Sequence, residues 1–227
     1  MIVGVIGRAR SGKNTVAKIA AEVVPNVCGQ LVEELAFADP LKKFCQEVYD
    51  FSDEQLWGPS EERNKPDVRY PRPHGFVDPT GTGSVVCDKC GKPYDVTSRV
   101  CSYLTPREAL QTLGTEWGRK CWPDTWLALG IRRARAADLR GRLVFITDCR
   151  FVNEGRAIKE GGGLLWRVER PGTDGASVRV AGHASEVEQK SEAMLQLVDV
   201  DIINDGDLDL LRTKVLVALR SIKRASD

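Results

Sequence analysis

The chain has 227 residues, of which 42% are hydrophobic and 29% are charged, a composition that excludes wholesale disorder. Its 33 Lys and Arg nearly balance its 32 Asp and Glu, so the net charge of +1 argues against nucleic acid as a partner. No run reaches the roughly 18 apolar residues of a membrane span, and apolar residues precede the first basic ones, the reverse of a secretory signal. Seven cysteines, an odd number in a chain too long to need disulfides, favour a reducing cytoplasm.

The first part of the chain alternates between strand and helix patterns. In order, we expect a strand at 2–6, a helix at 13–24, a strand at 31–37 and a helix at 40–49. The first strand is a short apolar run that ends at Gly7, which is typical of a buried parallel strand. The first helix should stop at Pro25, and the second begins with Asp39 as N-cap and Pro40 in its first turn.

Residues 58–102 interrupt this alternation. The stretch is rich in proline and glycine and has no helical periodicity, so we expect an irregular insertion. Order resumes at Thr105, where Thr-Pro-Arg-Glu predicts a capping box. The expected elements after it are helices at 106–117 and 124–137, a strand at 143–147, a helix at 153–160, strands at 164–168 and 200–203, and a helix at 208–222. Alternating strands and helices predict one α/β domain over 1–227 with a central parallel sheet and right-handed crossovers.

The segment Gly7–Thr15, with the sequence GRARSGKNT, carries the strongest functional signal. Glycines five residues apart and a following Lys13 fit a loop whose backbone N–H groups wrap phosphate oxygens. The loop lies between a predicted strand and a predicted helix, whose positive dipole end faces the same site. Asn14 departs from the strict pattern, because Ser or Thr is usual there and the hydroxyl arrives only at Thr15. The alternative is a chance glycine turn between a strand and a helix.

A second candidate follows the strand at 143–147. Asp148 and Arg150 lie at its carboxyl end, where ligands gather in open α/β sheets. Asp148 could hold Mg²⁺ or accept a hydrogen bond from a substrate hydroxyl, or it could cap the next helix. The guanidinium of Arg150 suits bidentate binding of a phosphate.

With these anchors placed, the chain outside about 70–102 resembles the bacteriophage deoxynucleoside monophosphate kinases. The resemblance is carried by residues 10–15, 38–42, 107–115, Trp126, 147–150 with Glu154, 170–172, 183–186 and 203–206, in the family's order. It implies a P-loop kinase fold that transfers the γ-phosphoryl group of ATP to a deoxynucleoside 5′-monophosphate with Mg²⁺. It also implies a homodimer in the (host) cytoplasm.

The resemblance also implies roles for single residues. Ser11, Gly12, Lys13, Asn14, Thr15 and Val16 would hold ATP, with Thr15 on Mg²⁺. The monophosphate would be held by Arg10, Leu41, Lys42, Arg63, Arg107, Gly114, Thr115, Trp126, Asp148, Arg150 and Glu154. The residues expected to act in catalysis are Lys13, Arg10, Asp148, Arg150 and Arg170. Residues 170–186 would form a lid shaped by His183 and Glu186. Asn14 stands where the family often has Asp, so the metal shell differs there.

The insertion contains Cys87-Asp88-Lys89-Cys90-Gly91, a pattern typical of a zinc knuckle. Only Cys101 and His74 are available to complete four ligands, and a water or a Cys₃ arrangement could replace His74. Reduced thiols without metal, or a redox pair, are the alternatives. Two rival functions therefore remain beside the deoxynucleotide kinase: another small P-loop kinase, for adenylate or a metabolite, and a nucleic-acid-binding module built on the knuckle.

Overall fold

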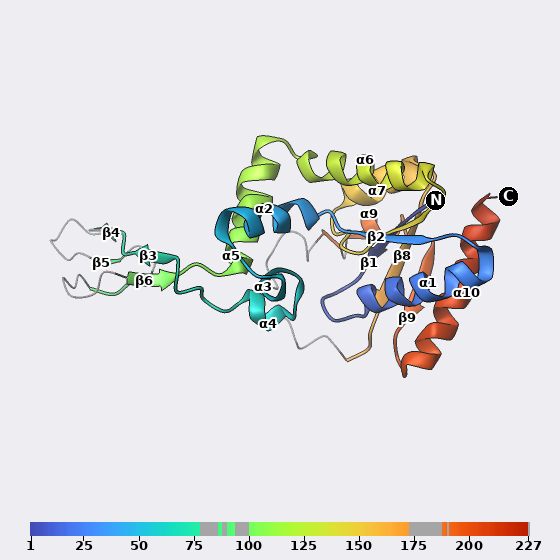
Figure 1. Cartoon of the computed structure of the whole chain (residues 1–227), viewed down its shortest axis with the longest axis horizontal. Helices are drawn as coiled ribbons and strands as arrows, with labels where there is room; N and C mark the ends of the chain where they lie inside the picture. Colours follow the sequence, from blue (N-terminus) through green and yellow to red (C-terminus); the bar gives the residue numbers. More distant parts are fainter. Residues whose placement is uncertain (78–85, 88–89, 94–99, 173–187, 190, 227) are drawn as a thin grey trace. The chain divides into compact units, whose positions relative to one another are not determined.

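Figure 1 shows the computed structural model of the chain, which describes residues 1–77, 86–87, 90–93, 100–172, 188–189 and 191–226. The chain divides into two units. Unit 1 comprises Met1–Asp39 and Pro123–Asp227, and unit 2 comprises Pro40–Trp122. Among the helices of the described part of the chain, none has both the length and the apolar character needed to cross a membrane.

Unit 1 is built on a parallel sheet. Within the described residues its strands are β1 (Ile2–Ile6), β2 (Val32–Leu35), β7 (Leu143–Ile146), β8 (Leu164–Glu169) and β9 (Val200–Ile203). They lie in the order β2-β7-β1-β8-β9, and every neighbouring pair is parallel. The predicted α/β fold with a central parallel sheet is therefore confirmed.

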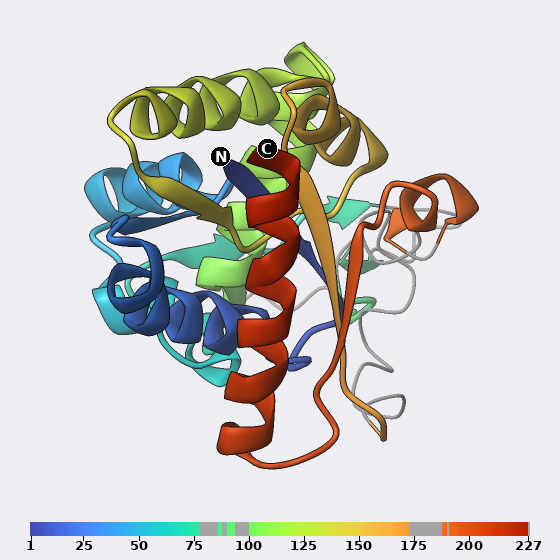
Figure 2. The same cartoon turned by 90° about the vertical axis from the view of Figure 1, so that its right-hand side faces the viewer.

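Helices cover both faces of this sheet (Figures 1 and 2). They are α1 (Lys13–Cys28) and α10 (Leu208–Ser226) on one face, and α6 (Thr125–Leu139), α7 (Val152–Glu160) and the short α9 (Glu192–Leu195) on the other. Side chains along β1 point alternately to the two faces of the sheet and so enter the hydrophobic core on each face. Val3 and Val5 pack with α1 and α10, whereas Ile2 and Ile6 pack with α6 and α7.

Unit 2 consists of short elements. Its helices are α2 (Asp39–Tyr49), α3 (Asp53–Trp57), α4 (Ser60–Arg63), α5 (Pro106–Gln111) and the π-helix η1 (Thr112–Arg119). Two antiparallel ladders pair β3 (Pro71–Pro73) with β6 (Val100–Tyr103) and β4 (Phe76–Val77) with β5 (Val86–Cys87). A small core forms where the helices meet, from Cys45, Phe51, Leu56, Leu104 and Ala109.

The structure corrects three expectations from the sequence. Helix α1 does not stop at Pro25 but runs to Cys28 and ends at Gly29, whose left-handed backbone lets its N–H donate to the Pro25 carbonyl at 3.1 Å. The helix expected at 106–117 becomes a π-helix from Thr112. The insertion is not wholly irregular, because the prolines of β3 lie in a two-stranded ladder, where a missing N–H is tolerated.

Candidate functional site

The loop between β1 and α1 has the backbone of a phosphate cradle. Gly7 and Gly12 have φ angles of 144° and 105°, a region that other residues rarely adopt. A Cβ on Gly7 would lie 2.2 Å from the Val168 carbonyl oxygen, and one on Gly12 would lie 2.6 Å from Nδ2 of Asn204. Both positions therefore require glycine, and the glycine spacing in the sequence reflects this geometry.

The start of α1 is open to an anion. Gly12 is the N-cap and offers no side chain to the first N–H groups of the helix. Ser11 is 1% exposed, and its Oγ has no hydrogen-bond partner among the described residues. A buried hydroxyl without a partner beside an uncapped helix start fits a ligand that carries several acceptor oxygens.

Lys13 places a positive charge at the same loop. Its Nζ donates to the carbonyl oxygens of Gly7 at 2.5 Å and Arg8 at 2.8 Å. These bonds fold the ammonium back over the loop instead of letting it extend into solvent. The charge is thereby fixed beside the N–H groups that would bind phosphate.

A cavity of about 550 Å³ adjoins the loop, a volume within the usual range of small-molecule sites. It is lined by Arg10, Gly12, Lys13, Asn14, Thr15, Arg170, Asn204, Gly206, Asp207, Leu208 and Leu211. The first six of these residues were predicted from the sequence, and the structure brings them together. Asn204, Gly206 and Asp207 come from the connection between β9 and α10, and Leu208 and Leu211 come from α10 itself. The sequence indicated only Asn204 and Gly206, within the block 203–206 of the family resemblance.

Asn204 holds the phosphate loop through a hydrogen bond to its backbone. It is 7% exposed, its Nδ2 donates to the Ser11 carbonyl at 2.9 Å, and its own N–H donates to the Glu169 carbonyl at 2.6 Å. Next to it, Nζ of Lys214 donates to the Ile203 carbonyl at 2.7 Å. The end of β9 is thus tied both to the phosphate loop and to α10, which makes Asn204 a positioning residue.

Asp148 binds backbone N–H groups at the end of the sheet. Its carboxylate accepts from Phe37 at 2.7 Å and from Ala38 at 2.9 Å, so it holds the chain that leaves β2. Burial raises the pKa of Asp148, and these N–H groups and the charge of Arg150 counteract the rise. In this structure Asp148 does not cap the following helix α7.

Glu154 performs that capping. It is 2% exposed, and its Oε2 accepts from the backbone N–H groups of Arg150 at 2.7 Å and Phe151 at 3.0 Å. The buried carboxylate thereby fixes the backbone that presents the Arg150 side chain, which is exposed. The geometry gives Glu154 a supporting position beside Arg150.

Some residues assigned to the monophosphate lie together in unit 2. Leu41 and Gly114 are both buried, and a Cβ on Gly114 would come within 3.2 Å of Cδ1 of Leu41. The Lys42 ammonium lies 5.6 Å from the centre of the Trp57 ring, a cation–π distance. Thr115 follows on the same π-helix, η1, a rare conformation that is frequent at functional sites. Trp126 lies on α6 of unit 1 and is half-buried.

Arg63 and Arg107 both stabilise the short helices of unit 2. Nη1 of Arg63 donates to the Gly58 carbonyl at 2.9 Å. Arg107 donates from Nη2 to Oγ of Ser60 at 2.6 Å and from Nε to Oδ1 of Asn64. The structure thus gives both arginines contacts that hold α4 to its surroundings.

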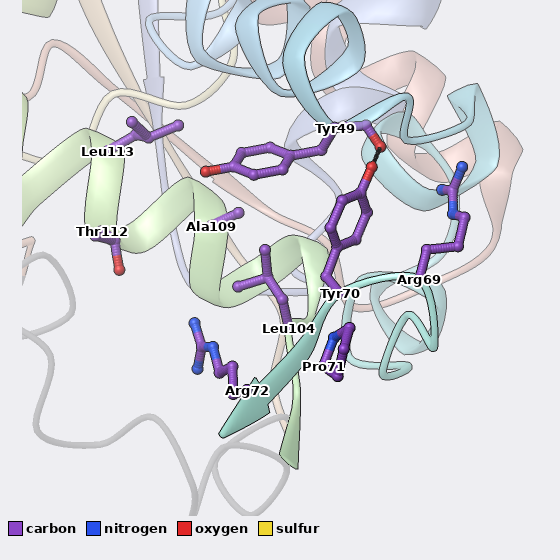
Figure 3. A pocket seen from close by; sticks show the side chains of 9 residues that line it. All are labelled: Tyr49, Arg69, Tyr70, Pro71, Arg72, Leu104, Ala109, Thr112 and Leu113. Carbon is purple, nitrogen blue, oxygen red and sulfur yellow. Dashed lines mark hydrogen bonds between the residues drawn. The ribbon is translucent and has the colours of Figure 1, made fainter. Parts of the chain in front are cut away.

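Unit 2 has its own cavity, of about 390 Å³, which the sequence did not reveal (Figure 3). It is lined by Tyr49, Arg69, Tyr70, Pro71, Arg72, Leu104, Ala109, Thr112 and Leu113. The rings of Tyr49 and Tyr70 meet edge to face at 5.5 Å, and the Tyr70 hydroxyl donates to the Tyr49 carbonyl. Arg69 is bound to Asp67, and Nη1 of Arg72 lies 3.3 Å from the Glu108 carboxylate. The aromatic rings together with the Arg72 guanidinium suit an aromatic ligand that carries negative charge.

The four predicted metal ligands also come together in unit 2. One ligand atom from each of His74, Cys87, Cys90 and Cys101 lies within 4.8 Å of the others. Loss of solvent, with hydrogen bonds to the neighbouring thiols, raises the pKa of Cys101 to about 11. Most of the predicted lid, including His183 and Glu186, lies outside the described residues.

Comparison with known protein families finds none that matches the chain. A protein of Acanthamoeba polyphaga mimivirus, named "Putative deoxynucleotide monophosphate kinase", is 28% identical over 226 residues, which cover 95% of this chain and 94% of the relative. A dephospho-CoA kinase from Campylobacter jejuni has a TM-score of 0.44 at 14% identity, and TT1252 from Thermus thermophilus has 0.45 at 15%. Each alignment covers 97% of this chain and 96% of the other. The strand order and the backbone of the loop between β1 and α1 define the chain as an α/β protein with a loop suited to phosphate.

Proposed function

We propose that the protein is a nucleotide kinase that transfers the γ-phosphoryl group of ATP to a deoxynucleoside 5′-monophosphate. The observation that carries this proposal is the phosphate loop, with its two obligatory glycines, its buried Ser11 hydroxyl and its fixed Lys13 charge. The mimivirus relative, which matches along nearly the whole chain, supports the choice of acceptor.

In this proposal the cavity of unit 1 holds ATP. The N–H groups at the start of α1 bind the β-phosphate, and Lys13 neutralises charge on the transferred group. Arg10 and Arg170 line the same cavity and would surround the equatorial oxygens. Thr15 also lines this cavity, and its hydroxyl would hold Mg²⁺, which would supply further neutralisation of the phosphates when bound with ATP.

We propose that residues of unit 2 bind the monophosphate. The family resemblance also assigns Arg150 and Glu154 to the acceptor. The tyrosine-lined cavity in Figure 3 offers ring faces for a base and the guanidinium of Arg72 for a phosphate. No strong general base is required, because the oxygens of a monophosphate are already ionised at neutral pH. Positioning and charge stabilisation therefore suffice for the reaction.

The lid and the homodimer are parts of the same proposal. Arg170 directly follows β8, so a lid over 170–186 would begin beside the donor cavity and exclude water, which otherwise competes as acceptor. Sedimentation of the purified protein tests the homodimer.

An acceptor panel tests the proposed function. The protein is incubated with Mg-ATP and, separately, dAMP, dGMP, dCMP, dTMP, AMP or dephospho-CoA, and formation of ADP and of the phosphorylated acceptor is measured. We expect turnover with at least one deoxynucleotide and loss of that turnover in Lys13→Ala. Turnover with AMP or dephospho-CoA alone would establish the rival small-molecule kinase instead. Salt-dependent DNA binding without any turnover would favour the nucleic-acid-binding module.

A further inference from the structure

The residues His74, Cys87, Cys90 and Cys101 come from three different parts of the insertion. His74 follows β3, Cys87 lies in β5, Cys90 follows it in a turn, and Cys101 lies in β6. The ladder β3–β6 and the ladder β4–β5 have separate hydrogen bonds. The four side chains therefore converge between two ladders that are otherwise distinct.

Two distances within this cluster match those of a tetrahedral metal site. Sγ of Cys87 and Sγ of Cys101 are 3.6 Å apart, and Sγ of Cys90 is 3.7 Å from Nδ1 of His74. Around zinc, with Zn–S of about 2.3 Å and Zn–N of about 2.0–2.1 Å, two sulfurs lie about 3.8 Å apart and a sulfur and a nitrogen about 3.6 Å apart. A disulfide would bring two sulfurs to about 2.05 Å, so the Cys87 and Cys101 thiols are not bonded to each other.

Backbone hydrogen bonds link Cys87 to the residues that follow Cys90. The N–H of Gly91 donates to the Cys87 carbonyl at 2.9 Å, and the N–H of Cys87 donates to the Lys92 carbonyl at 2.8 Å. Gly91 has a φ of 68°, and no atom lies near the position of its missing Cβ. Glycine adopts this positive φ at little cost, and the two hydrogen bonds hold Cys87 close to the backbone of Gly91 and Lys92.

The described part of the insertion buries few side chains. Among residues from Pro71 to Tyr103 whose burial is described, only Cys87 is buried. The strands β4 and β5 have two residues each, and a ladder of this size is marginal in water without a hydrophobic face to cover it. The ordering entropy of these residues needs a source of free energy other than burial of apolar side chains.

We propose that His74, Cys87, Cys90 and Cys101 bind one zinc ion in a closed structural site that joins the two ladders. Three thiolates and an imidazole form a soft donor set that selects zinc over magnesium or calcium. Four protein ligands leave no open position for water or substrate, so the ion is structural and not catalytic. Binding of the ion supplies the free energy that orders the insertion.

Metal analysis of the intact protein tests the site. The chain is purified under reducing conditions without chelator, and we expect close to one zinc per chain. Replacement of zinc by Co²⁺ should give the visible absorption of a tetrahedral cobalt site with thiolate ligands. Protein without zinc, or cobalt with an octahedral spectrum, would overturn the proposal.

Variants separate this site from other cysteines. We expect Cys87→Ser combined with Cys90→Ser to lose the metal and to be cleaved faster by protease within 71–103. The matched control is Cys121→Ser, because Cys121 is an exposed cysteine of the same unit outside the cluster. His74→Ala should weaken zinc binding at least tenfold in competition with a chromogenic chelator. Full zinc content in the double variant would contradict the proposed ligands, and unchanged affinity in His74→Ala would remove the histidine from the set.

Discussion

At the scale of single residues, the phosphate loop depends on a few side chains that cannot be exchanged. Lys13 is held over the loop by the Gly7 and Arg8 carbonyls, so its charge is preorganised where negative charge develops in phosphoryl transfer. We expect Lys13→Ala to lower kcat at least about a hundredfold, the typical effect of removing one preorganised group. Steady-state kinetics with the best acceptor measures this effect.

Lys18→Ala is the matched control for this variant. Lys18 lies on the same helix, α1, but its side chain is exposed on that helix. Near-normal turnover is expected for Lys18→Ala, and both variants should keep the melting temperature of the parent protein. A Lys13→Ala variant with normal kcat would contradict the assignment of the loop.

Asn204 supports the loop without belonging to it. Asn204→Ala removes the donor to the Ser11 carbonyl and leaves a buried acceptor unpaired, which costs about 1–3 kcal/mol. We expect ATP to bind at least fivefold more weakly, while the KM of the acceptor changes little. The control is Asn26→Ala, because Asn26 is an exposed asparagine of α1 that does not line the cavity. Calorimetric titration with ATP is the measurement. If the binding of ATP and of the acceptor were weakened equally, Asn204 would have a general structural role instead of positioning the loop.

The sequence predicted the residues of the loop better than their support. Glycine spacing and Lys13 are local signals, because they lie in one segment and their chemistry follows from their order. The bond from Asn204 to Ser11 joins residues 193 positions apart, so no local pattern could reveal it. The same holds for Asp148, whose partners Phe37 and Ala38 follow another strand.

At the scale of elements, the start of α5 is fixed by a capping box that the sequence predicted. Oγ1 of Thr105 accepts from the Glu108 N–H at 3.1 Å, and the Glu108 carboxylate accepts from the Thr105 N–H at 2.9 Å. We expect Thr105→Ala to lower the free energy of unfolding by about 1 kcal/mol. Urea unfolding followed by circular dichroism measures the change.

Thr213→Ala is the control for the cap. Thr213 is exposed inside α10, where its hydroxyl donates to the Asp209 carbonyl, and alanine has the higher helix propensity there. Thr213→Ala should therefore be neutral or slightly stabilising. If Thr105→Ala were equally neutral, the cap would contribute nothing to the stability of unit 2.

Elements with a strong apolar pattern were predicted nearly to their ends, as β1 and β9 show. Elements whose ends or type do not follow from an apolar pattern were predicted less well. Pro25 lies within α1 because Gly29 and not the proline ends the helix. The π-helix η1 and the short helix α9 have no periodicity long enough to distinguish them from their surroundings.

At the scale of the whole molecule, the two units are stabilised in different ways. Unit 1 has two extensive cores on either side of its sheet. In its described residues unit 2 has one small core, and it also has polar contacts such as those of Asp67, a carboxylate that is only 8% exposed. We therefore expect unit 2 to be the more sensitive of the two to changes in ionisation.

Asp67 makes this expectation testable. Its carboxylate accepts from Nε of Arg69 at 3.0 Å, from Nη2 of Arg69 at 2.8 Å and from Nε2 of Gln55 at 3.1 Å. The Arg69 hydrogen bonds hold the pKa of Asp67 well below its ordinary value of 3.8. The folded state therefore binds this proton less readily than the unfolded state. The stabilisation is fully present above the ordinary pKa and is lost as the pH falls below it.

We expect the urea midpoint of unit 2 to fall steeply below about pH 4, at a higher pH than the urea midpoint of unit 1. Asp67→Asn should lower the midpoint at pH 7 and flatten its fall in acid, because the group that titrates is gone. Fluorescence reports on both units, because Trp57, Trp117 and Trp122 lie in unit 2, whereas the half-buried Trp126 and the fully buried Trp166 lie in unit 1. Glu116→Gln, which changes an exposed carboxylate of unit 2 to an amide, is the control and should keep the acid dependence of the parent protein. If the urea midpoint of Asp67→Asn fell in acid as steeply as that of the parent protein, other carboxylates would govern the stability of unit 2.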